Sequence, residues 1–319
     1  MEYTKREFLF LSWINTKEPF LHSTFLYRLI KQSILENKNL FRISEEELFQ
    51  FICEEQLYTR KEYEKVLILI EDFFREEIQE EISNIETICK KEEIEMIPYG
   101  EENYPFPLKN IRNSPYVLYL KGKLPQTEIL KKSVALVGSR DCSEEGKNFA
   151  KKVAQYLKKN KIYNISGLAK GIDSIGHLET LGQTGAILGQ GLTREIYPRE
   201  NQILASRILN MGGFLLSELP PLTPVSMEHL IARNRLQSGL TSGIIIAESA
   251  LQGGTLHTFR FAREQGKKIY VASLNQKFIQ KYHKDIIVLE NISDFEKKKR
   301  EREKNLCCIF ESEIYTKIS

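Results

Sequence analysis

The first hundred residues of this chain almost lack glycine, since all 18 glycines of the 319 residues lie between Gly100 and Gly266. A segment so poor in glycine cannot contain many tight left-handed turns, so we expect it to be helical. The glycine-bearing remainder is expected to alternate strands, helices and functional loops. The composition, 41% hydrophobic and 28% charged, excludes collagen-like, disordered and disulfide-scaffold proteins.

Long apolar runs and paired cysteines are also missing. No apolar run reaches the roughly 18 residues that a membrane span needs, and the N-terminus is too charged for a secretory signal. The five cysteines have no metal-ligand spacing, and a reduced protein is the simplest interpretation. We therefore expect a cytoplasmic protein with no membrane partner, no metal site and no cofactor.

The net charge of only +3 conceals an uneven distribution. Residues 1–100 hold 13 Lys and Arg against 21 Asp and Glu, whereas the remainder holds 33 against 22. A basic surface suits salt-dependent binding of nucleic acid. The acidic first part is expected to contact protein or to pack on the core rather than to bind DNA.

The spacing of apolar residues separates the same two parts. Helical spacing over 1–97 predicts four or five helices, and a proline-rich extended connector follows at 95–124. Thereafter short β-branched runs alternate with amphipathic segments, which predicts an α/β fold with a Rossmann-like, doubly wound, mostly parallel sheet. The expected domains are a helical accessory domain (1–97), a Rossmann-like DNA-binding domain (98–290) and a charged C-terminal tail (291–319).

Glycine-rich loops follow several of the expected strands. In a doubly wound sheet, ligands bind beyond the carboxyl ends of the strands, and such loops occur here at 138–140, 166–173, 189–191 and 252–255. Glycines let the backbone approach a ligand, free N–H groups at helix starts favour anions, and Arg140 and Lys170 add positive charge. One such loop could be only a tight turn, but four at one edge favour phosphate binding.

The common nucleotide motifs are absent, and the other basic residues are ambiguous. No complete G-x-G-x-x-G or P-loop occurs, which disfavours a dinucleotide dehydrogenase and a P-loop ATPase. Arg233 and Arg235 lie on a helix expected over 226–239 and cannot point the same way. One could reach the binding edge while the other forms a structural ion pair. Lone histidines such as His177 are expected to be structural.

Taken in order, the motifs resemble the DprA/Smf family of DNA-processing proteins. The segments that carry the resemblance span about residues 96–272 and include VALVGSR, SGLAKGIDSIGH, GAILGQGLTREIYPREN, ARNRLQSGLTSGIIIAES and GGTLHTFRFAREQGKKIYV. The resemblance implies a non-enzymatic protein that binds single-stranded DNA, forms a homodimer, protects incoming DNA and loads the RecA recombinase in natural transformation. The candidate DNA-binding residues are Gly138, Ser139, Arg140, Ser166, Gly167, Lys170, Gly171, Asn234, Arg235 and Gly254, and no residue is assigned a catalytic role.

Two alternatives remain open from the sequence. Nucleotide phosphoribohydrolases of the wider Rossmann-like superfamily carry a Gly-Gly-x-Gly-Thr-x-x-Glu motif. The segment 251–258 of this chain lacks the third glycine and the glutamate of that motif. The nearest downstream acid is Glu264, and general acid/base work needs a carboxylate within hydrogen-bond reach. A module that senses a nucleotide without processing it would use the same loops.

Overall fold

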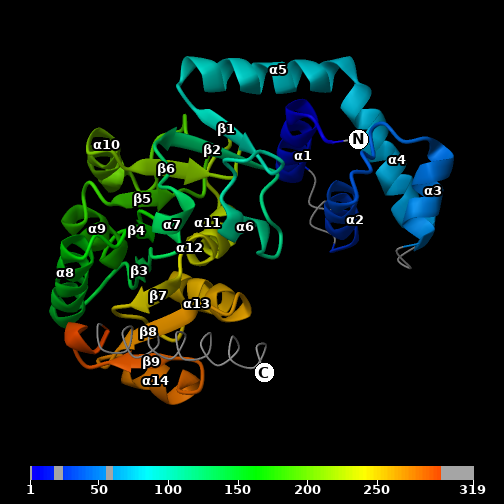
Figure 1. Ribbon diagram of the computed structural model, residues 1–319. Coiled ribbons are helices and arrows are strands. Elements are labelled where there is room, and N and C mark those ends of the chain that lie inside the picture. The colour runs from blue at the N-terminus through cyan, green and yellow to red at the C-terminus, as the bar shows by residue number, and fades with distance from the viewer. Residues whose placement is uncertain (1, 18–23, 55–59, 296–319) are drawn as a thin grey trace, which may run out of the picture. The chain divides into compact units, whose positions relative to one another are not determined.

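The computed structural model describes residues 2–17, 24–54 and 60–295 (Figure 1). The helices are α1 (Lys5–Lys17), α2 (Thr24–Leu35), α3 (Glu45–Glu54), α4 (Arg60–Phe74), α5 (Glu76–Lys91), α6 (Phe106–Lys109), α7 (Thr127–Leu130), α8 (Glu144–Lys159), α9 (Ile172–Glu179), the 3₁₀ helix η2 (Arg199–Asn201), α10 (Gln202–Asn210), α11 (Met227–Ala232), α12 (Asn234–Leu240), α13 (Gly254–Glu264) and α14 (Gln276–Tyr282). The strands are β1 (Glu95–Pro98), β2 (Val117–Gly122), β3 (Ala135–Val137), β4 (Asn164–Ser166), β5 (Thr184–Ile187), β6 (Phe214–Ser217), β7 (Gly243–Ile246), β8 (Lys268–Ala272) and β9 (Ile287–Leu289).

Contacts divide the chain into two compact units. The first unit contains the described residues within 1–127, 187–197 and 214–233, and the second contains those within 128–186, 198–213 and 234–295. This division crosses the ranges expected from the sequence, because two later segments join the N-terminal unit. The ranges 1–97, 98–290 and 291–319 remain a prediction, and most of the expected tail, residues 296–319, lies outside the described residues.

The N-terminal part of the first unit is helical, as its low glycine content predicts. Helices α1 to α5 make up most of its described residues up to Lys91, and the non-helical residue Arg75 separates α4 from α5. Their apolar stripes meet in a core whose fully buried members include Leu9, Phe10, Leu29, Phe51 and Val66. Helix α5 buries Ile82, Ile85 and Cys89 and leaves its glutamate-rich side in solvent.

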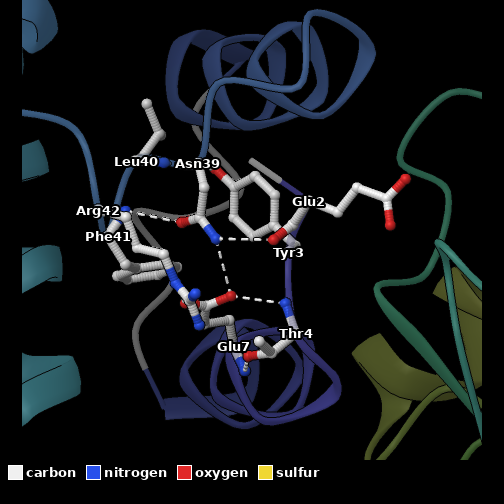
Figure 2. Close-up of polar contacts among 8 residues, drawn as sticks. All are labelled: Glu2, Tyr3, Thr4, Glu7, Asn39, Leu40, Phe41 and Arg42. Atoms are coloured by element: carbon white, nitrogen blue, oxygen red, sulfur yellow. Dashed lines mark hydrogen bonds and ion pairs between the residues drawn. The ribbon is translucent and has the colours of Figure 1, made fainter.

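A buried carboxylate holds the chain start against the turn after α2 (Figure 2). Glu7 is only 2% exposed, and it accepts hydrogen bonds from the Thr4 N–H at 2.6 Å and from the Asn39 side-chain amide at 2.9 Å. The Arg42 guanidinium lies 3.0 Å from the same carboxylate and compensates its charge. Burial raises the pKa of the neighbouring Tyr3 to about 12. The network gives hydrogen-bond partners to the polar groups that this turn buries. Without such partners, their burial in the core would be costly.

The strands of the first unit are antiparallel. Strand β1 pairs with β2, Glu95 lying opposite Leu120, and β2 pairs with β6, Tyr119 lying opposite Ser217. The proline-rich connector at 95–124 contains β1, the short helix α6 and, at its end, β2 over the run VLYLKG. The apolar run GFLLSE (213–218) forms β6, and its partner β2 makes it part of an antiparallel pair.

The second unit contains the parallel strands. The order β3-β7-β8-β9 is parallel throughout, β4 pairs with β5 in parallel, and a parallel bridge joins Val134 to Asn164. Helices α8 and α9 contact each other, α9 contacts β3 and β4, and α13 contacts β7 and β8 (Figure 1). The expected α/β fold with a mostly parallel sheet and a helical N-terminal region is therefore confirmed.

Alternate residues of the parallel strands enter two different cores. Leu136, Ile245 and Tyr270 face a cluster that includes Val153 of α8. Their neighbours in the same strands face the other cluster, which is built on Phe259 of α13. Both faces of the sheet are thus covered by helices, which explains why each strand reads as a continuous apolar run.

Candidate nucleic-acid interface

The loop after β3 carries the first predicted cation. Gly138 and Ser139 are half-buried, whereas Arg140 is exposed and has no ion-pair partner within the described residues. The Ser139 N–H donates to the Glu248 carbonyl at 2.8 Å, so the loop after β7 holds the loop after β3. The Ser139 N–H is therefore not free to meet a phosphate, contrary to what a glycine-rich loop suggests, and Arg140 is the group that this loop offers.

The loop after β4 carries the second cation on a rigid backbone. Leu168 is buried in the left-handed region at φ +57, a conformation that a leucine adopts only when its surroundings enforce it. The buried Asp173 carboxylate accepts from the Gly167 N–H at 3.0 Å and from the Ala169 N–H at 3.4 Å. These N–H groups donate to the protein's own carboxylate and are not free to meet a phosphate, so a role of Gly167 beside bound DNA stays a prediction.

His177 completes the support of this loop. Its Nε2 accepts from the Leu168 N–H at 3.3 Å, which leaves Nδ1 as the donor to Thr184 Oγ1 at 2.7 Å. Thr184 Oγ1 donates in turn to the Asn164 carbonyl at 2.8 Å. The chain of bonds fixes a neutral imidazole in one tautomer. His177 thus has the structural role that we expected of a lone histidine.

Gly171 joins the two loops. Its φ is +74, and a Cβ at this position would lie 2.3 Å from the Ser139 carbonyl oxygen and 2.6 Å from the Arg140 carbonyl oxygen. The next residue, Ile172, donates its N–H to the Ser139 carbonyl at 3.2 Å. The backbones that carry Arg140 and Lys170 therefore meet at a contact that only glycine permits.

The Lys170 side chain is half exposed and already has a partner. Its Nζ donates to the carboxylate of Glu200, which lies in η2 and is itself 62% exposed. This hydrogen bond lowers the pKa of the Glu200 carboxyl below its usual value. Within the described residues, the site thus combines a paired cation, Lys170, with an unpaired one, Arg140.

Ser166 lies inside the unit rather than at its surface. It is fully buried, its hydroxyl donates to the Leu136 carbonyl at 2.9 Å, and it accepts from the Gln237 side chain at 3.4 Å. A direct contact between this hydroxyl and DNA would require the unit to open. Ser166 instead connects β4 to β3 and to α12.

The remaining predicted residues lie at the starts of α12 and α13. The Asn234 side chain is buried and reaches the Gly254 carbonyl at 3.5 Å. Gly254 is exposed, and a Cβ there would meet nothing within 4 Å. Arg235 is half-buried, and its carbonyl accepts from Gln265 at 2.9 Å.

The helix expected over 226–239 is two helices, α11 and α12, separated at Arg233. The buried Arg233 donates to the Ile187 carbonyl at 2.7 Å in the first unit. Its neighbour Asn234 is tied to Gly254 in the second unit, so different partners fix the two residues at the break. Arg233 thus makes a structural hydrogen bond to the backbone.

Sequence reasoning missed the carboxylates that organise these loops. Glu248 accepts from Ser143 N–H at 3.0 Å and from Ser143 Oγ at 2.7 Å, next to the first turn of α8. A Cβ on Gly146 would lie 1.9 Å from the same carboxylate, which explains that glycine. An acid directly after an apolar strand, as in the run SGIIIAES, is the signal that could have pointed to Glu248.

The described part of the chain has neither a cluster of metal ligands nor a membrane-spanning helix. No group of three or more His, Cys, Asp or Glu residues there is placed to hold a metal ion. None of its helices is long and apolar enough to cross a bilayer.

The region that contains the site matches a known protein family. Residues 95–286 match the family model described as DNA recombination-mediator protein A. The chain is 39% identical over 173 residues to the DNA processing protein DprA of Streptococcus pneumoniae, covering 53% of this chain and 60% of that protein. It is 36% identical over 178 residues to the protein Smf of Escherichia coli, covering 55% and 47%. The matches thus span no more than about 60% of these curated relatives.

Solved structures give the same family. The X-ray structure of DNA processing protein A from Streptococcus pneumoniae has a TM-score of 0.68 at 25% identity, covering 92% of this chain and 97% of that one. The structure from Helicobacter pylori, described for its single-stranded DNA binding mode, has a TM-score of 0.57 at 25% identity, covering 63% and 95%.

Proposed function

Because the chain belongs to the DNA recombination-mediator protein A family, also called DprA/Smf, we propose that it binds single-stranded DNA at the loops 138–140 and 167–171. The observation that carries the proposal is the joint at Gly171, which brings the backbones of Arg140 and Lys170 together at the carboxyl ends of β3 and β4. Cations held on a rigid backbone at this edge suit phosphates.

The candidate DNA-binding residues have four roles in this proposal. Arg140 and Lys170 contact phosphates, while Gly138, Ser139, Gly167 and Gly171 shape the two loops beneath them. Ser166 supports the loops from inside. Asn234, Arg235 and Gly254 extend the binding edge along the starts of α12 and α13.

A nucleotide-processing enzyme is not favoured by this geometry. Glu264 is the last residue of the 11-residue helix α13, which places it about 15 Å from the glycines at the start of the helix. The Glu248 carboxylate is held by Ser143. The proposed function is therefore binding, without catalysis.

The first test is DNA binding by the full chain. Fluorescence anisotropy with a labelled oligonucleotide of roughly 30 nucleotides should show binding that weakens steeply between about 50 and 200 mM salt, because each neutralised phosphate contributes about −0.7 to the slope of log K against log salt. A nucleoside monophosphate should stabilise the chain in a thermal shift much less than the oligonucleotide does. Binding that salt does not change, or release of free base from the monophosphate, would contradict the proposal.

The partners are a second proposal. We infer that the chain acts in the cytoplasm as a homodimer, that it protects incoming DNA, and that it loads RecA during natural transformation. An affinity-tagged chain should retain RecA when single-stranded DNA is present, and light scattering should give the mass of a dimer. RecA retention that is equal without DNA, or without the chain, would contradict the proposed loading of RecA. A monomer mass at every concentration would contradict the proposed homodimer.

A further inference from the structure

The Lys170–Glu200 pair is built into the fold rather than formed by two free side chains. Asn201, the residue after Glu200, is buried and donates its side-chain amide to the Leu168 carbonyl at 2.8 Å and to Ser174 Oγ at 3.0 Å. Leu168 belongs to the loop that carries Lys170, and Ser174 donates to the Ala169 carbonyl of that loop at 2.6 Å. Asn201 thus anchors η2 on the Lys170 loop and sets Glu200 beside its partner.

The neighbouring cation differs from Lys170 in one respect. Arg140 is exposed and has no ion-pair partner within the described residues. A phosphate can therefore approach Arg140 directly. At Lys170, the phosphate must take the place of a carboxylate that already holds the ammonium group.

We propose that Glu200 is an internal competitor for the phosphate site at Lys170, which lowers the affinity for DNA and favours a chain of phosphates over a single nucleotide. The inference rests on the proposed function of the loops. A lone phosphate at Lys170 only exchanges one anion for another. A polynucleotide held at Arg140 presents its next phosphates at high local concentration, so it displaces Glu200 more readily.

The test replaces the Glu200 carboxylate with an uncharged amide of the same shape. Glu200→Gln should bind single-stranded DNA about two- to five-fold more tightly at low salt, the range that an exposed ion pair is worth. Its plot of log K against log salt should be steeper by about 0.7, because Lys170 then neutralises a phosphate without releasing a carboxylate. AMP should also compete better against the labelled oligonucleotide than it does on the wild-type chain.

A matched control separates this effect from net charge. Glu128→Gln removes the same charge from another exposed pair, Lys131–Glu128, in the same unit. It should leave the affinity and the salt slope close to those of the wild type. An equal gain from Glu128→Gln would overturn the inference, because the gain would then come from overall charge.

A second background tests whether Glu200 acts through Lys170. In a Lys170→Ala chain, Glu200→Gln should change the affinity by less than about 1.5-fold, because the competitor has lost its cation. A gain that persists there contradicts the inference, as does an unchanged affinity of the single variant. Failure of the wild-type chain to bind DNA would instead refute the proposed function, so the two failures are distinguishable.

Discussion

Replacing Arg140 and Lys170 together with alanine is expected to weaken the binding of single-stranded DNA roughly a hundredfold at low salt. A hydrogen bond to a charged group contributes about 1.5–3 kcal/mol, so two full phosphate contacts would contribute more than a hundredfold to the affinity. The Lys170 contribution is reduced because a phosphate must displace Glu200. Arg140 should therefore account for the larger share, and Arg140→Ala should be the more damaging of the two single variants.

The double variant should also change the salt dependence. Loss of Arg140 removes one neutralised phosphate, so the slope of log K against log salt should become shallower by about 0.7. Lys170 adds little to this slope, because in the wild type it only exchanges the Glu200 carboxylate for a phosphate. Anisotropy titrations at several salt concentrations measure both quantities. Both side chains are exposed, so the variant should keep the circular dichroism spectrum and the melting temperature of the wild type.

The matched control is Lys131→Ala with Lys151→Ala. These lysines lie in the same unit, are 55% and 57% exposed, and form surface ion pairs with Glu128 and Glu179. The control removes the same positive charge from the unit and should lower the affinity only a few-fold through the long-range field. If the two double variants bind DNA equally, the assignment of the loops fails, and the basic charge of the unit as a whole is responsible.

The parallel part of the fold could be predicted because its signals are local. Short runs such as SVALVGS are apolar at every position, and the structure shows why, since Leu136 and Val137 enter cores on opposite faces of β3. The pairing of β6 with β2 could not be predicted in the same way. Tyr119 and Ser217 lie opposite each other but are far apart in sequence, and no local spacing specifies such a partner.

The same limit applies to the candidate site. Its glycines and cations lie in short motifs, so their positions at strand ends follow from the sequence. Its carboxylates act over long separations, Glu200 on Lys170 across 30 residues and Glu248 on Ser143 across 105 residues. An isolated glutamate in a sequence looks like a solvated surface residue, and only the fold shows which cation or helix start it meets.

Gly171→Ala is expected to cost about 4 kcal/mol of stability and to abolish DNA binding by the chain that still folds. The alanine must adopt φ +74, and its Cβ must avoid the Ser139 carbonyl oxygen, which would lie 2.3 Å away. A residue forced into a sparsely populated region costs about 1–3 kcal/mol, and an overpacked contact costs a similar amount. Relief requires the loops 138–140 and 167–171 to separate, which moves Arg140 away from Lys170.

Gly212→Ala separates the backbone effect from the contact. Gly212 has a similar φ of +80, but a Cβ there would meet nothing within 4 Å, so the substitution should cost only about 1 kcal/mol and leave DNA binding intact. Thermal denaturation and anisotropy on both variants give the comparison. If Gly171→Ala unfolds the chain, its DNA binding cannot be measured. The Arg140 and Lys170 variants, compared with the wild type in the same assay, then test the site. Equal stability of the two glycine variants, with equal DNA binding, would show that close contact at Gly171 does not hold the two cationic loops together.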